Sequence, residues 1–176
     1  IWCNHTEFAG YGGPFTLTIN ANKTNYYNQT DSFDINILGQ TEALTVERWP
    51  VADPYDSTDW FNITVTFEES ALSADPGIAD ADITVYVGGS LITSDTYYLG
   101  NGQYNLTIWC NHTEFAGYGG PFTLTINANK TNYYNQTDSF DINILGNTEE
   151  LEINRWPIFE PYNSTHWFNI TVSFNE

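Results

Sequence analysis

Thirty-nine consecutive residues, Ile1 to Gly39, occur a second time without change as Ile108 to Gly146. The match continues at the same offset of 107 residues, where 18 of 30 positions agree between 40–69 and 147–176. A fixed period of this length indicates tandem copies of one structural unit, and each copy must fold in the same way. The chain is therefore expected to be an array and not one compact body.

The period divides the chain into one complete unit and parts of two others. A unit of about 100 residues is large enough to form its own hydrophobic core. The predicted divisions are the C-terminal half of a repeat over 1–40, a complete repeat over 41–146 and the N-terminal strands of the next repeat over 147–176. Ile1 corresponds to Ile108, which lies inside the run 103–110, so we expect the chain to be a segment of a longer array.

Apolar and polar residues alternate along most of the complete unit, with the two-residue period of half-buried β-strands. Phe61, Ile63 and Val65, for example, alternate with Asn62 and Thr64. Clusters of Gly, Pro and Asn separate six or seven such runs, and no helical periodicity occurs. The pattern predicts an all-β fold of tandem immunoglobulin-like β-sandwich repeats with a 107-residue period.

The charge of the chain excludes several classes of partner. Twenty-two acidic residues stand against four basic ones, which gives a formal net charge of −18. Phosphate backbones and anionic lipid surfaces repel such a chain, so neither nucleic-acid binding nor membrane binding is expected. No run of 18 apolar residues is present, so no membrane insertion is predicted within this sequence.

Each repeat carries one cysteine, Cys3 in the first copy and Cys110 in the second. A single cysteine cannot form a disulfide within its own domain, and Cys110 falls on the apolar side of its run. A buried free thiol is therefore the expectation. A cross-link between neighbouring domains or chains is the alternative.

Two segments, Gly100–Ile108 (GNGQYNLTI) and Pro121–Lys130 (PFTLTINANK), carry a resemblance to a known class of domain. They resemble the closing strands of immunoglobulin-like and fibronectin-III-like tandem repeats in prokaryotic, particularly archaeal, cell-surface proteins. The resemblance covers about half of each unit. It implies an extracellular, structural or adhesive role without catalysis, and it implies no particular partner.

Asn-X-Ser/Thr sequons, the acceptor sites for N-glycosylation, occur ten times in the chain. A single sequon is weak evidence, but the sequons are closely spaced along this chain. Several of the asparagines also fall on the polar side of their strands, which indicates surface positions. Covalent N-glycans are therefore expected, and no dissociable cofactor is predicted. The candidate acceptors are Asn4, Asn22, Asn28, Asn62, Asn105, Asn111, Asn129, Asn135, Asn163 and Asn169.

Six of these asparagines have a tryptophan or tyrosine two residues upstream, a spacing that places both side chains on the same face of a strand. An exposed aromatic ring would offer the first sugar an apolar face on which to stack. Packing of the aromatic residues against a neighbouring domain or chain is the alternative. The six candidates are Trp2, Tyr26, Trp60, Trp109, Tyr133 and Trp167.

Two acidic clusters are candidates for Ca²⁺, which prefers six to eight oxygen ligands. The first contains Asp53, Asp56 and Asp59, but the second copy replaces them with Glu160, Asn163 and His166. The second cluster contains Glu68, Glu69, Asp75, Asp80 and Asp82, where a solvated acidic loop is the simpler interpretation. The three histidines are too scattered for a transition-metal site, and no nucleophile with an adjacent base is visible. The sequence thus predicts no required metal and no enzyme activity.

These features together predict a non-catalytic component of an extracellular, glycosylated filament, stalk or surface layer. Its main partner would be itself, because identical units present identical joints and propagate one geometry along the array. The alternative function is a carbohydrate-binding adhesin array that uses exposed Trp and Tyr. A non-catalytic repeat region attached to an enzyme, and strand exchange between neighbouring repeats, also remain open at this point.

Overall fold

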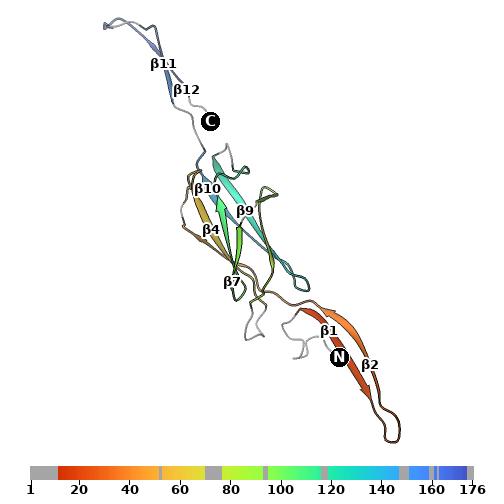
Figure 1. The fold of residues 1–176 in the computed structure, drawn as a ribbon. Coiled ribbons are helices and arrows are strands. Elements are labelled where there is room, and N and C mark those ends of the chain that lie inside the picture. The colour runs from red at the N-terminus through yellow and green to blue at the C-terminus, as the bar shows by residue number, and fades with distance from the viewer. Residues whose placement is uncertain are drawn as a thin grey trace.

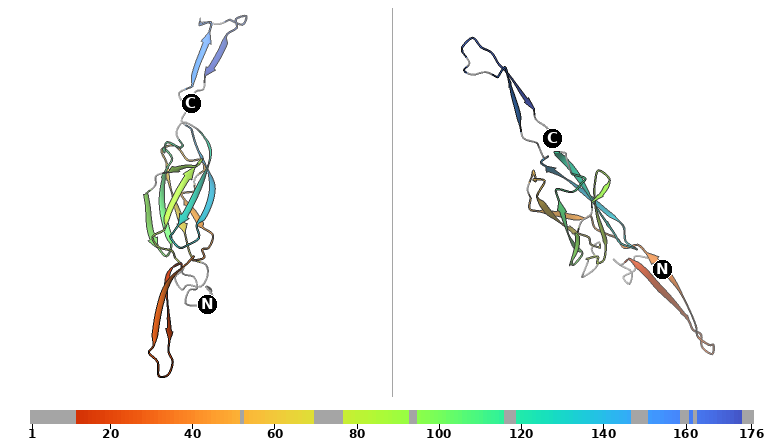
Figure 2. Two further views of the ribbon diagram at one scale, coloured as in Figure 1. Left: turned by 90° about the vertical axis from the view of Figure 1, so that its right-hand side faces the viewer. Right: turned by 45° about the horizontal axis from the view of Figure 1, so that its top comes forward.

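The computed structural model describes residues 12–51, 53–69, 77–92, 95–115, 119–146, 151–158, 161 and 163–173, with Asp95 described by its backbone alone. These residues form twelve β-strands in four antiparallel sheets. Two four-stranded sheets pack as a sandwich, and a two-stranded hairpin lies beyond each of its ends (Figures 1 and 2). None of these residues belongs to a helix long and apolar enough to cross a membrane.

The sandwich has the strand order of an immunoglobulin-like domain. One sheet has the order β3-β4-β8-β7, and the other has the order β10-β9-β5-β6. These correspond to strands A-B-E-D and G-F-C-C′ of that fold. The bounds are β3 (Thr45–Trp49), β4 (Trp60–Thr66), β5 (Asp82–Val87), β6 (Ser90–Ile92), β7 (Asp95–Gly100), β8 (Gln103–Trp109), β9 (Gly120–Asn129) and β10 (Gln136–Ile144). The predicted all-β, immunoglobulin-like fold is confirmed.

The core lies between the two sheets and is made by the alternating apolar residues of both. Phe61 is fully buried and stacks on Tyr55 with ring centroids 4.8 Å apart. Removal of these side chains from water is the main favourable contribution to the stability of such a domain. The fully buried apolar positions on the facing strands are Phe61, Ile63 and Val65 of β4, Leu106 and Ile108 of β8, Val85 of β5, Leu124, Ile126 and Ala128 of β9, and Ile142 of β10.

The two end hairpins repeat strand pairs of the sandwich. The hairpin of β1 (Gly13–Ala21) and β2 (Gln29–Ile37) has the register of β9 and β10, one period earlier. The hairpin of β11 (Glu152–Trp156) and β12 (Asn169–Ser173) corresponds to β3 and β4, one period later. No opposing sheet covers the first hairpin within the described part of the chain. Its Ile19 is therefore 55 % exposed, whereas the equivalent Ile126 is fully buried.

The segment between the first hairpin and the sandwich packs against the turn that joins β9 to β10. The Gly39 amide donates to the carbonyl of Asn132 at 2.7 Å, and the Tyr134 amide donates to the carbonyl of Gly39 at 3.2 Å. A Cβ atom on Gly39 would lie 2.6 Å from the ring of Tyr133, so only glycine allows this approach. The short connection is thus a packed joint that includes backbone hydrogen bonds.

Cys110 is a free, buried thiol at the end of β8, with 1 % of its surface exposed. Burial raises the pKa of this thiol to about 11, and the negative charges of Asp59 and Asp56 add to the effect. Cys3 lies outside the described residues, so its expected state stays a prediction.

We expect Cys110 to resist alkylation by iodoacetamide at mildly alkaline pH in the folded chain, because the thiolate is the reactive form and is suppressed there. After unfolding in guanidinium chloride the same thiol should react fully. Peptide mapping of the alkylated chain measures Cys110 separately from Cys3. Rapid labelling of Cys110 in the folded protein would contradict the burial.

Candidate functional site

The outer face of the sheet β3-β4-β8-β7 brings two sequons into direct contact. In the β4–β8 pairing Asn62 is opposite Thr107, and Thr64 is opposite Asn105. Each candidate acceptor therefore faces the threonine of the other sequon. The Thr107 hydroxyl donates to Asn62 Oδ1 at 2.8 Å. This bond uses the amide oxygen and not Nδ2, the atom to which an N-linked sugar is joined.

Each of these two asparagines also has an exposed aromatic residue directly opposite on the outer neighbouring strand. Trp49 of β3 pairs with Asn62, and Tyr97 of β7 pairs with Asn105. Directly opposite residues have Cβ atoms about 5 Å apart, within reach of an aromatic ring. Trp49 is 67 % exposed and Tyr97 is 69 % exposed.

Reasoning from the sequence found Trp60, two residues before Asn62, but missed Trp49 and Tyr97. Spacing along one strand cannot reveal a cross-strand neighbour. Asn105 in particular has Gln103 at the upstream position and no aromatic residue. These neighbours follow only from the register of the sheet. The pairing of β3 with β4 gives Trp49, and the pairing of β7 with β8 gives Tyr97.

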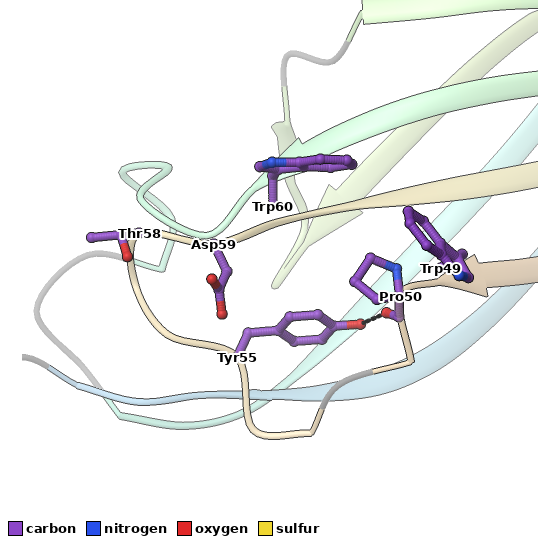
Figure 3. Close-up of a pocket in the computed structure, with 6 residues that line it drawn as sticks. All are labelled: Trp49, Pro50, Tyr55, Thr58, Asp59 and Trp60. Atoms are coloured by element: carbon purple, nitrogen blue, oxygen red, sulfur yellow. Dashed lines mark hydrogen bonds between the residues drawn. The ribbon is translucent and has the colours of Figure 1, made fainter.

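A pocket opens where β3 ends and β4 begins (Figure 3). Its volume is about 320 Å³, and its lining residues are Trp49, Pro50, Tyr55, Thr58, Asp59 and Trp60. The Tyr55 hydroxyl donates to the carbonyl of Pro50 at 2.6 Å and fixes one wall (Figure 3). Exposed indole faces and a nearby carboxylate can bind a ligand that has both an apolar face and hydroxyl groups.

The acidic residues beside this pocket organise the loop. Asp59 Oδ2 accepts from the Asp56 amide at 2.8 Å, and Asp56 Oδ1 accepts from the amide and the hydroxyl of Thr58, both at 3.0 Å. The bond from the Thr58 amide, followed by that from its hydroxyl, lowers the pKa of the Asp56 carboxyl.

The second copy keeps these bonds with different side chains. Asn163 Oδ1 accepts from the amide and the hydroxyl of Thr165, and His166 Nδ1 accepts from the Asn163 amide at 3.2 Å. The changes Asp56 to Asn163 and Asp59 to His166 therefore preserve hydrogen-bond acceptors. The described residues contain no group of three or more His, Cys, Asp or Glu side chains placed to hold a metal ion.

The other candidate acceptors of the sandwich are exposed at several places. Asn129 and Asn135 lie at one end of the second sheet and are exposed. Together with Asp82 they line a pocket, and most of the residues that line it are polar. Asn111 follows β8, two residues after Trp109. Trp109 is exposed and pairs directly with Trp60, which extends the aromatic surface across two strands.

Tyr133 occupies a different environment from the other candidate stacking residues. It is half-buried in the joint, and its hydroxyl donates to Glu69 Oε1 at 2.5 Å. Glu69 is 6 % exposed, and burial raises the pKa of its carboxyl above the usual value, with the bond from Tyr133 opposing the shift. Tyr133 also packs against Gly39, in the segment that joins the first hairpin to the sandwich.

The hairpins carry the remaining candidates. Asn22, Asn28 and Tyr26 are exposed in the first hairpin, and the Lys23 ammonium lies 4.7 Å from the centre of the Tyr26 ring. Asn163, Asn169 and Trp167 are exposed in the second, with Trp156 directly opposite Asn169. Asn4 and Trp2 lie outside the described residues.

The chain has no match among known protein families and none among curated protein sequences. Among solved structures, it is similar to the crystal structure of murine CEACAM1b, with a TM-score of 0.45 and 11 % identity over 80 % of this chain and 61 % of that chain. It is also similar to protocadherin Gamma B2 extracellular cadherin domains 3-6, with a TM-score of 0.41 and 10 % identity over 90 % of this chain and 39 % of that chain. The chain thus spans less than two thirds of either structure. Its immunoglobulin-like fold rests on the strand order of its own two sheets.

Proposed function

We propose that this chain is part of an extracellular, N-glycosylated filament, stalk or surface layer built from tandem immunoglobulin-like domains, and that it has no catalytic role. Such arrays occur in the prokaryotic surface proteins that its repeats resemble. The observation that carries the proposal is the outer sheet face on which Asn62 and Asn105 lie among exposed aromatic residues. Large exposed aromatic patches mark surfaces that are covered or bound in the working protein.

The exposure of the other sequons supports the same proposal. Nine of the ten candidate asparagines belong to the described residues, and seven of these are exposed and two half-buried. A sugar chain can be accommodated only where the asparagine is reachable from solvent. A dense glycan layer would also shield the aromatic residues that the fold leaves outside its core.

The packed joint supports a mechanical role. Gly39 and the residues that precede it are identical in sequence to Gly146 and the residues that precede it, whereas Gln40 is replaced by Asn147. When the same joint recurs between identical units, each unit adds the same rise and rotation, and the array becomes an extended rod with itself as its main partner.

Intact-glycopeptide mass spectrometry on native material tests the glycan part of the proposal. We expect high occupancy at most of Asn62, Asn105, Asn111, Asn129 and Asn135, because all five are sequon asparagines accessible to solvent. Asn143, which is exposed but lies outside any sequon, is the matched negative control. Unmodified asparagines throughout would remove the main support for a glycosylated array.

The pocket between Trp49 and Trp60 favours one other function, that of an adhesin which grips carbohydrate from another source. In that case the unglycosylated chain would bind free glycans, and a Trp49→Ala variant would lose the binding. Glycan-array binding by unmodified protein distinguishes this function from the structural one.

A further inference from the structure

The pocket of Figure 3 lies immediately beside a candidate glycan acceptor. Trp49, on one side of the pocket, is the direct cross-strand partner of Asn62, and Trp60 lies two residues before it on the same strand. Residues in these two relations project from the same face of the sheet. A sugar attached to Asn62 Nδ2 therefore starts next to both indoles.

We propose that this pocket is the binding site for the first sugars of the glycan on Asn62, so that each repeat holds its own glycan against its surface. The inference rests on the proposed glycosylation of Asn62 and adds the place where that glycan is bound. The CH face of a pyranose ring packs on an indole face, and its hydroxyls hydrogen-bond at the ring edge.

The volume of the pocket agrees with an occupant of this size. At about 320 Å³ it is at the lower limit of small-molecule pockets, which suits the first sugars of a chain and not a folded partner. Both tryptophans are exposed, and neither is needed to close the hydrophobic core.

Two tryptophans and a sequon asparagine recur with the same pairing and spacing one period later in the chain. Trp156 is directly opposite Asn169, and Trp167 lies two residues before that asparagine, with the two indole centroids 5.9 Å apart. His166 replaces Asp59 there, so the carboxylate is not common to the two copies. The shared elements are the two tryptophans and the acceptor asparagine, which are the parts that the proposal requires.

Covalent attachment explains why the occupant is the chain's own glycan and not a free sugar. A ligand on a short tether has an effective concentration of about millimolar at an adjacent site. Even a weak contact between the attached sugar and the indoles therefore forms within the molecule. A free sugar from solution would have to displace the attached sugar from the pocket.

Timed release of glycans by an N-glycosidase from the folded, glycosylated chain tests the proposal, with glycopeptide quantification at each site. Asn105 is the internal reference, because it lies on the same face, is half-buried like Asn62 and does not adjoin the pocket. Loss of two stacking contacts in the variant Trp49→Ala/Trp60→Ala should accelerate release at Asn62 about tenfold and leave Asn105 unchanged. An unchanged rate at Asn105 also shows that the variant is folded.

Trp109→Ala is the matched control variant, since Trp109 is exposed on the same face but does not line the pocket. Release at Asn62 should be unaffected by this change. Equal acceleration by Trp109→Ala, or no acceleration by the double variant, would overturn the pocket assignment while leaving the glycosylated array intact. A bare Asn62 with the other sites occupied would do the same, and bare asparagines at every site would overturn both proposals.

Discussion

Replacing Ile126 with alanine is expected to lower the free energy of unfolding of the sandwich by about 3 kcal/mol. Ile126 is fully buried in the centre of β9, where it packs among core residues from both sheets. The substitution removes apolar contact area and leaves a cavity that close-packed neighbours cannot fill. Guanidinium titration followed by tryptophan fluorescence measures the change.

The control for this experiment is built into the chain. Ile19 has the same sequence on both sides as Ile126 but is 55 % exposed in the β1–β2 hairpin. Ile19→Ala should therefore change the stability of the sandwich by less than about 0.5 kcal/mol. Equal losses from the two substitutions would show that the hairpin is covered to the same degree as β9, contrary to the structure.

Replacing Gly102 with alanine is expected to destabilise the sandwich by about 3 kcal/mol or more, for two independent reasons. Gly102 has a φ of +70° in the turn between β7 and β8, a conformation unfavourable for residues with a Cβ. An added Cβ would also lie 2.3 Å from the carbonyl oxygen of Phe67. The contact is to backbone, and the Phe67 amide already donates to the Gly102 carbonyl at 2.9 Å, so neither segment can move without breaking that bond.

Gly88→Ala separates the two causes. Gly88 also has a positive φ, of +56°, but nothing lies within 4 Å of a Cβ built there. Alanine at this position should cost only about 1 kcal/mol, the conformational part of the effect. Thermal unfolding of the two variants compares them directly, and a similar loss in both would rule out the steric contact with Phe67.

The sequence predicted the strands whose two faces differ in polarity and missed those whose faces do not. Alternation located β4, β5, β8, β9 and β10, since one side of each strand is buried in the core. It missed the edge strand β7 (Asp95–Gly100), in which the described side chains from Thr96 to Leu99 are all exposed. The three residues of β6 are too few to show a period.

The candidate site was predictable in its parts but not in its assembly. The acceptor asparagines and Trp60 follow from local motifs, whereas Trp49 and Tyr97 become neighbours of the acceptors only through pairing with other strands. Tyr133 shows the opposite limit, because its spacing to Asn135 equals that of Trp60 to Asn62. The position of the Tyr133 side chain is determined by the joint. There Tyr133 pairs with Gly39, which lies 94 residues earlier in the sequence.

The packed joint also sets how an array of such repeats would respond to a pulling force along its length. Tension would cross the short segment around Gly39, which is held to the β9–β10 turn by two backbone hydrogen bonds, whereas β9 and β10 pair along nine residues. The least-supported contacts open first when a structure opens locally. A stretched array would therefore extend at its joints while each core stayed folded, and would recover its length when the load was removed.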